Sequence, residues 1–194
     1  MKIEEYSIIL KEHEQKEVTT TFTESVKQKI QVYIPAGATY KQQITSYGKH
    51  DIQVMYIFYL QGKGASAELK GRLYMQDYGK QDWIVQQIHS APETSSTTDI
   101  KAVITDHSFL NYEGTITIEK SAFKSVAHQE QKNLILGSGA RVTSIPNLQV
   151  LTHDVQCGHG SAVSYLDDDH LFYLLSRGIP FEKAQQMVIE GFLL

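Results

Sequence analysis

The stretch Gly114-Thr115-Ile116-Thr117-Ile118-Glu119 decides the fold class of this chain, because apolar and polar side chains alternate along it. Successive side chains of an extended strand point to opposite faces, so a period of two predicts a strand with one buried face. The same alternation runs through residues 100–105. The runs 31–34 and 53–60 are rich in the β-branched and aromatic residues that suit a pleated sheet. These stretches predict strands, not helices.

Turn signals interrupt the strand-like stretches at short intervals between residues 17 and 157. They are Pro35-Ala36-Gly37, Gly62-Lys63-Gly64, Gly79, Pro92, Gly137-Ser138-Gly139 and Pro146. Many short strands with frequent turns and no helix between them predict an all-β body. A sandwich, a barrel and a β-solenoid all remain open on this pattern, because no clean repeat period singles out the solenoid.

The pattern changes to helical spacing at Asp167. The acids of 167–169 can cap a first helix, which Gly178 can end, and Pro180 can open a second helix. The second helix carries one apolar stripe, formed by Phe181, Ala184, Val188, Gly191 and Phe192. We therefore predict a β body over 1–165 and a helical segment over 166–194. This hairpin either caps the open end of the body or docks a partner protein.

Composition narrows the class of protein. The chain has 194 residues, a formal net charge of −4 and one cysteine, Cys157. It has no block of Lys and Arg, which argues against nucleic acid as a partner. It also has no apolar run near the roughly 20 residues of a membrane helix, so no membrane is expected. A lone cysteine suits a reducing compartment, and the expected location is the cytoplasm.

Catalytic motifs are weak in this sequence. None of the Gly-Lys pairs has the preceding glycine of a phosphate-binding loop, and 137–142 only half-resembles a dinucleotide fingerprint, since Pro146 arrives before a helix could form. No two histidines stand four apart, as metalloproteases require. A Cys-His nucleophile pair lacks an orienting third group and a set of oxyanion donors, so hydrolysis is not expected.

After these exclusions, one group of possible metal ligands remains, in the segment 153–160. On an extended strand His153, Cys157 and His159 would point the same way, with neighbours on that face roughly 6.6 Å apart. Thiolate and imidazole are ligands that soft metals and iron–sulfur clusters accept. The alternative is structural: a buried free cysteine behaves as a small hydrophobe, and His159 could be a core histidine. Gly158 and Gly160 permit a break that would turn His159 outward.

The C-terminal third resembles the SufB/SufD family, and it is closer to SufD. The matching segments are Asp154-Val155-Gln156-Cys157-Gly158-His159-Gly160, Leu166-Asp167-Asp168, Leu171-Phe172-Tyr173-Leu174 and Ser176-Arg177-Gly178-Ile179. The upstream runs 131–136 and 145–150 are similar to the family as well, and 89–96 and 112–118 are similar to its preceding rungs. The resemblance is strong from about 129 to 193 and moderate from 83 to 128.

The resemblance implies a right-handed parallel β-helix with a small C-terminal α-helical hairpin. It implies a scaffold subunit for iron–sulfur cluster assembly that is not itself an enzyme, and that pairs through its β-helix with a SufB-like subunit or with itself. His159 would then donate an imidazole to iron or a transient iron–sulfur cluster. Cys157 would be a supporting ligand or a structural neighbour, and His153 is a weaker candidate. A SufC-like ATPase would dock on the hairpin through Phe172, Arg177, Phe181, Val188 and Phe192.

Departures from the family leave two further hypotheses open. Family members are commonly about twice as long, Gly158 stands where SufD usually has serine, and the cluster-building cysteine and glutamate of SufB have no visible counterpart. A SufD-like adaptor that binds no metal is therefore the alternative function. An unrelated sandwich or barrel with a closed pocket is the third hypothesis. His89 is a weak ligand candidate, expected in a surface turn before Pro92.

Overall fold

Two parallel sheets form the body of the molecule in the computed structural model, which describes residues 2–194. The odd sheet contains β1 (Glu4–Ile9), β3 (Val26–Ile34), β5 (Ile52–Leu60), β7 (Lys80–His89), β9 (Phe109–Ile118) and β11 (Arg141–Val150), in that spatial order. The even sheet contains β2 (Gln15–Phe22), β4 (Thr39–Gly48), β6 (Ser66–Met75), β8 (Ser95–Thr105), β10 (Val126–Leu136) and β12 (Gln156–Tyr165).

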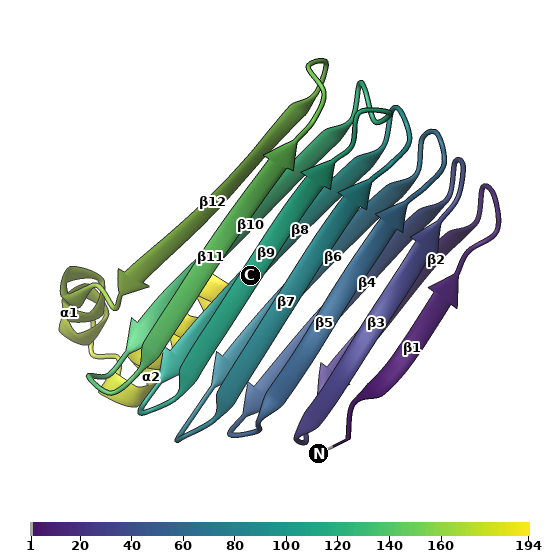
Figure 1. The fold of residues 1–194 in the computed structure, drawn as a ribbon. Coiled ribbons are helices and arrows are strands. Elements are labelled where there is room, and N and C mark those ends of the chain that lie inside the picture. Colours follow the sequence, from purple (N-terminus) through teal and green to yellow (C-terminus); the bar gives the residue numbers. More distant parts are fainter. Residues whose placement is uncertain (1) are drawn as a thin grey trace.

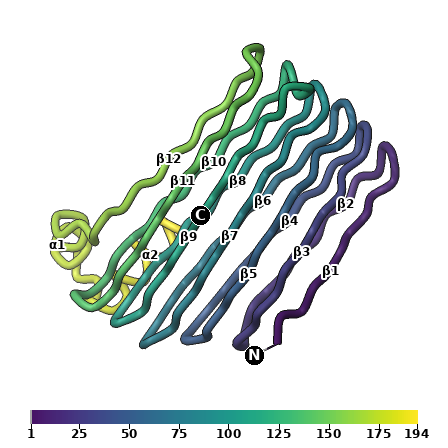
Figure 2. Tube along the Cα trace, viewed as in Figure 1, coloured from purple at the N-terminus to yellow at the C-terminus, as the bar shows by residue number. Residues whose placement is uncertain are grey.

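The chain alternates between the two sheets, so each coil consists of one odd strand and the following even strand. In Figure 1 the odd strands run upward in front, the even strands run downward behind, and successive coils advance to the left. This sense of winding makes the body a right-handed parallel β-helix. The predicted all-β body and its β-helix form are therefore confirmed, and the sandwich and the barrel are excluded. Figure 2 traces the same path from the first coil to the last.

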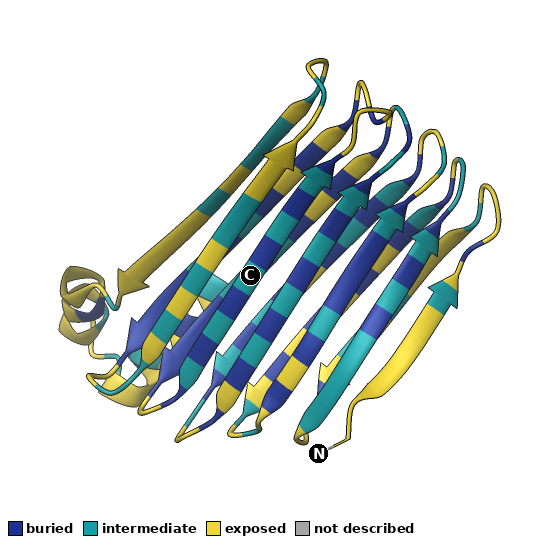
Figure 3. Cartoon of the chain, viewed as in Figure 1, coloured by how far each residue is buried: buried dark blue, intermediate teal, exposed yellow. Residues whose placement is uncertain are grey.

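The core lies between the two sheets, where the inward side chains of successive coils stack. Figure 3 shows the alternation of buried and more exposed positions along the strands. Trp83, Tyr40, Tyr112 and Phe58 are among the largest fully buried side chains. Parallel sheets in α/β proteins are covered by helices on both faces, whereas here only one face of each strand meets the core. This difference explains why a parallel structure has a sequence with a period of two.

The turns that join odd strands to even strands stack in the same way as the strands. Gly37 and Gly64 have positive φ angles, and Glu93 and Lys124 take the same conformation in later coils without being glycine. The amide of Gly37 donates to the carbonyl of Lys63 (3.0 Å), and the amide of Glu93 donates to that of Phe123 (2.9 Å). The turn conformation is therefore stabilised by hydrogen bonds between coils.

Two helices follow the last strand: α1 (Asp168–Ser176) and α2 (Phe181–Leu193). The side chain of Asp167 accepts a hydrogen bond from the amide of Asp169 (2.9 Å), Gly178 has a φ of 78°, and Pro180 precedes α2, all as predicted. Within residues 2–194, no helix is long and apolar enough to cross a membrane.

The position of α2 differs from the expectation that the hairpin caps the open end of the body. Ile189 packs against a cluster formed by Val103, Leu134 and Leu136, which all belong to the even sheet. The helix thus lies on the outer face of that sheet and leaves the end of the β-helix at β11 and β12 uncovered (Figure 1). The physical reason is local, because the outward side chains of β8 and β10 are apolar where α2 crosses them.

Candidate functional site

Cys157 and His159 lie on β12, the last strand of the even sheet. Cys157 pairs in register with Ala127 of β10, and His159 pairs with Gln129. Ala127 and Gln129 are both buried in the interior. Side chains at paired positions of parallel strands point to the same face, so Cys157 and His159 face the inside of the last coil. The structure therefore brings these two residues onto one face, two positions apart.

Cys157 is half-buried at the beginning of this face. Together with Val155 it packs against a small apolar cluster formed by Ile116, Ile118, Ala122 and Ala127. This packing fixes one side of the thiol against the core and leaves the other side accessible. The structural interpretation and the ligand interpretation of Cys157 are compatible, because the residue is neither sealed in nor free in solvent.

His159 is exposed although it faces inward. The sequence suggested that Gly158 and Gly160 break the strand here, but β12 runs without interruption from Gln156 to Tyr165. His159 is accessible for another reason: within the described chain no further coil follows β11 and β12, so the inner face of the last coil is open. The core histidine interpretation of His159 is therefore wrong.

His153 does not share the strand with Cys157 and His159. It lies in the turn between β11 and β12 and is exposed there, three residues before the strand begins. His153 consequently does not share a strand face with Cys157 and His159. A role for His153 as a ligand stays a prediction that the fold does not favour.

Polar side chains near His159 form hydrogen bonds between the two sheets. The hydroxyl of Ser161 on β12 donates to that of Ser144 on β11 (2.7 Å), and the Ser144 hydroxyl donates in turn to the buried side chain of Gln131. The amide of Asn133 donates to the carbonyl of Ala162 (3.2 Å). The inner face of the last coil is therefore polar in this region. No sequence motif marks these residues, because only the coiling of the chain brings β11 against β12.

His89 differs from its expected place in a surface turn, because it is fully buried at the end of β7. Its ring nitrogens contact the hydroxyls of Thr94 (2.7 Å) and Ser96 (2.8 Å). Burial lowers the pKa of His89 to about 4, so the ring is neutral at physiological pH. His89 is a structural residue of the core and is not placed to bind a surface ligand.

The described residues contain no group of three or more His, Cys, Asp or Glu side chains that could hold a metal ion. Cys157 and His159 therefore supply at most two protein ligands on this chain. Iron in an iron–sulfur cluster takes four ligands in all, some of them sulfide. Any cluster at this position needs further ligands from outside the described chain.

The outer edge of β12 carries no protection against strand pairing. Its sequence, Gln156 to Tyr165, contains no Lys, Asp, Glu or Pro, and β12 pairs on one side only, with β10. Natural edge strands usually carry charges, proline or bulges that prevent association with other chains. An unprotected strand of ten residues indicates a surface that another strand can pair with.

The five residues predicted to dock a partner fall into two groups, one exposed and one packed against the body. Phe172 and Phe181 are 71% and 49% exposed, and the guanidinium of Arg177 is also exposed, 5.3 Å from the ring centre of Tyr173. Val188 and Phe192 instead pack on the outer face of the even sheet. Only the first group is free to contact a second protein, because Val188 and Phe192 are covered by the body.

A family model described as "SUF system FeS cluster assembly, SufBD core domain" matches residues 11–192. The chain is 37% identical to the iron-sulfur cluster assembly protein SufD of Escherichia coli (strain K12) over 92 residues, which are 47% of this chain and 22% of that protein. It is 32% identical over 139 residues to the iron-sulfur cluster assembly protein SufB of Bacillus subtilis (strain 168), covering 69% of this chain and 29% of that protein.

A SufBD family protein of Staphylococcus saprophyticus gives the same values: 32% identity over 139 residues, with 69% of this chain and 29% of the relative covered. The matched parts therefore span less than a third of each of these three relatives. The family model covers nearly the whole chain, and the parallel β-helix is the fold that the resemblance implied. The chain belongs to the SufB/SufD family.

Proposed function

We propose that this chain is a scaffold unit for the assembly of iron–sulfur clusters, with no catalytic turnover of its own. The observation that carries the proposal is the position of Cys157 and His159, which lie side by side on the open inner face of the last coil in a member of this family. The relatives named above are iron–sulfur cluster assembly proteins, which supports the same process for this chain.

The proposed chemistry is ligand donation to a cluster that is cargo, not a resident cofactor. His159 would donate an imidazole nitrogen and Cys157 a thiolate sulfur, both of which are accepted by iron–sulfur clusters. The half-buried position of Cys157 limits the approach of water to the sulfur, and the exposure of His159 allows a partner to reach it. Two ligands hold a cluster weakly, which suits a site that must also release it.

The missing ligands would come from a second subunit that pairs with the open end, either a SufB-like protein or another copy of this chain. The unprotected edge of β12 supports strand pairing, and the open coil exposes apolar inward residues such as Val163 (48%) and Leu148 (37%). A partner that continues the β-helix would bury these residues and enclose Cys157 and His159 at the seam.

The exposed part of the hairpin would dock a SufC-like ATPase. Phe172 and Phe181 are large exposed aromatic side chains, and Arg177 provides a cation next to them. Aromatic residues and arginine are the types that dominate the energy of protein interfaces. Because α2 is packed on the even sheet, movement of the ATPase could be passed to the body through α2.

Anaerobic reconstitution with ferrous iron and sulfide tests the ligand assignment. The parent protein, together with its pairing subunit, should develop visible charge-transfer absorbance, and His159→Ala should lose most of it. His153→Ala is the matched control and should behave like the parent, since His153 lies in the turn outside the strand. Equal absorbance in His159→Ala and the parent would show that the imidazole is not a ligand.

An adaptor that binds no metal is the second candidate, favoured by the absence of a complete ligand set within residues 2–194. Pull-down with the ATPase separates it from the first candidate. Phe172→Ser with Phe181→Ser should abolish capture under both functions. Retention of the ATPase by a protein that never takes up iron or sulfide, with or without a pairing subunit, would establish the adaptor.

A further inference from the structure

A second surface feature lies on the outer face of the odd sheet, away from the inner face that carries Cys157. Lys80, Phe109 and Arg141 stand in register on β7, β9 and β11, so the phenyl ring lies between two cationic side chains. Neighbouring strands are about 4.8 Å apart, which places the two basic residues on the order of 10 Å from each other. At this spacing, both basic side chains can contact one small anionic molecule that lies over the phenyl ring of Phe109.

Neither basic side chain is neutralised by a carboxylate within the described part of the chain. The ion pairs of residues 2–194 involve other residues, and Lys80 and Arg141 belong to none of them. One acid, Asp82, lines the same hollow, and its carboxylate accepts a hydrogen bond from the amide of Gln53 (3.4 Å). Among the residues that line the hollow, two bases therefore stand against one acid, and the carboxylate of Asp51 accepts a hydrogen bond from the backbone amide of Lys80 beside it (3.1 Å).

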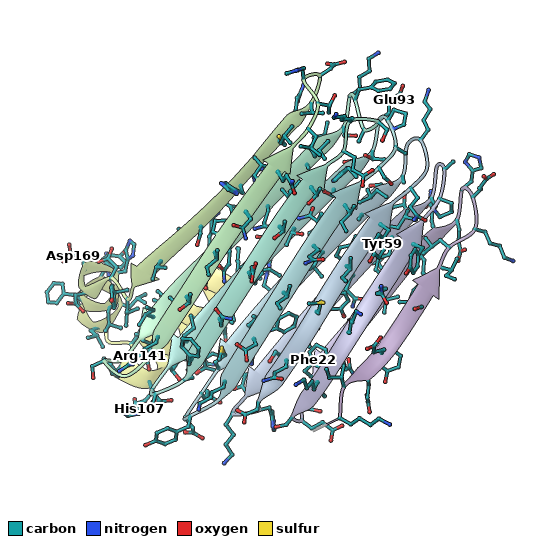
Figure 4. The ribbon with its side chains drawn as sticks, in the orientation of Figure 1. Phe22, Tyr59, Glu93, His107, Arg141 and Asp169 are labelled. Carbon is teal, nitrogen blue, oxygen red and sulfur yellow. The ribbon has the colours of Figure 1, made fainter. Side chains whose placement is uncertain are left out.

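An exposed imidazole completes the surface. The ring of His107 stacks on that of Tyr78, with 5.1 Å between the ring centres and 18° between their planes. The same ring lies against Gly139, where an added Cβ would come within 2.5 Å of His107 Cδ2. Figure 4 shows His107 and Arg141 at the same edge of the body. The imidazole thus contacts a tyrosine ring and occupies the space that Gly139 leaves open.

These residues line an open hollow of about 530 Å³, formed by Lys80, Asp82, His107, Phe109, Gly139 and Arg141. Two basic residues on an open sheet face are ordinarily solvated and bind nothing. Here they flank an aromatic ring, a stacked imidazole and a hollow of the size of a small ligand. This combination, not the charge alone, distinguishes the surface.

We propose that this hollow binds a small phosphate monoester that carries a planar apolar group. The guanidinium of Arg141 can donate two parallel hydrogen bonds to phosphate oxygens, and Lys80 adds a point charge. The planar group stacks on Phe109, and His107 donates from its ring. The site is independent of the proposed cluster function, because it shares no residue with the last strand, β12.

Titration with phenyl phosphate, followed by NMR of the histidine side chains and by calorimetry, tests the proposal. Binding should shift the His107 resonances and weaken as salt is added. The double variant Lys80→Gln with Arg141→Gln should weaken binding at least about 10-fold, since two charge-assisted contacts are lost. The matched control is Lys11→Gln with Lys120→Gln, which removes the same charge from exposed positions in the opposite turns.

A third variant separates ring stacking from charge. Phe109→Leu should weaken phenyl phosphate by several-fold and leave inorganic phosphate unchanged, because only the ester presents a ring to residue 109. Circular dichroism should be the same for all variants. Equal binding by the two double variants, or saturation that leaves the His107 resonances unmoved, would overturn the assignment.

Discussion

His89 shows how the β-helix uses a polar residue inside its core. Both ring nitrogens have hydroxyl partners, Thr94 Oγ1 and Ser96 Oγ, so one nitrogen accepts and the other donates in the neutral ring. Protonation would place a charge in the interior, away from water. This is the physical cause of the low pKa of His89, about 4.

The free energy of unfolding should therefore fall as the pH drops from about 6.5 to about 4. In this range His89 is protonated in the unfolded chain but stays neutral in the folded protein. The contribution is fully present above the pKa of unfolded histidine. Its loss levels off below the folded pKa, where both states are protonated. The decrease should be about 2 to 3 kcal/mol, measured by urea denaturation across this pH range.

His89→Gln should be less stable than the parent at pH 7.5 and should flatten the pH dependence between 6.5 and 4. His50→Gln is the control, because His50 lies in a turn outside the core and its replacement should keep the parent slope. A slope in His89→Gln equal to that of the parent would show that another group controls the transition.

At the scale of single elements, the turns depend on close contact between coils. Gly62 lies before β6, where an added Cβ would come within 2.0 Å of the backbone nitrogen of Ala36 in the preceding coil. Backbone cannot move aside as a flexible side chain can. The requirement for glycine at this position is therefore steric and arises from the neighbouring coil.

Gly62→Ala should destabilise the protein by about 2 kcal/mol or more, because the stacked turns must separate to admit the methyl group. Gly160→Ala is the matched control: it lies in regular strand, and nothing lies within 4 Å of the added Cβ. Thermal unfolding of the two variants compares them directly. Equal melting temperatures would contradict the close packing of the turns.

The helix α2 provides a second prediction for an element. Val188 and Phe192 pack against the even sheet, whereas Phe172 and Phe181 project into solvent. Val188→Ala and Phe192→Ala should each cost about 1 to 3 kcal/mol of stability, and Phe172→Ala and Phe181→Ala should change it by less than about 0.5 kcal/mol. Chemical denaturation gives both values, and comparable losses in the two pairs would refute the packing of α2.

At the scale of the whole molecule, the β-helix lacks a cover over β11 and β12 within the described chain. A partner that pairs with this end should be displaced by a charge on the open inner face. Val163→Lys should therefore reduce self-association, or association with a SufB-like subunit, at least about 10-fold, since a lysine would have to be buried at the seam.

Sedimentation velocity over a range of protein concentrations measures this effect. Thr23→Lys is the control, because Thr23 is exposed in the turn between β2 and β3 and adds the same charge far from the open end. If Val163→Lys and the parent associate equally under all conditions, the partner does not contact the last coil.

The absence of a visible repeat in the sequence has a structural explanation. The number of residues per coil is not constant: Glu4 pairs with Gln28, 24 positions later, and Phe109 pairs with Arg141, 32 positions later. Strands and turns both contribute to the difference, because β1 and β2 have 6 and 8 residues whereas β9 and β10 have 10 and 11. A fixed period cannot appear in such a sequence, although every coil has the same architecture.

Local sequence patterns predict the strands, the capped hairpin and the placement of Cys157 and His159 on one face, because strand alternation and helix capping depend on neighbouring residues. Resemblance to the family adds the β-helix, since alternation alone does not distinguish it from a sandwich or a barrel. The exposure of His159, the separate position of His153 and the burial of Val188 and Phe192 follow from the folded structure alone. Those outcomes depend on which coil follows which, and residues about thirty positions apart in the chain become neighbours only when the chain has coiled.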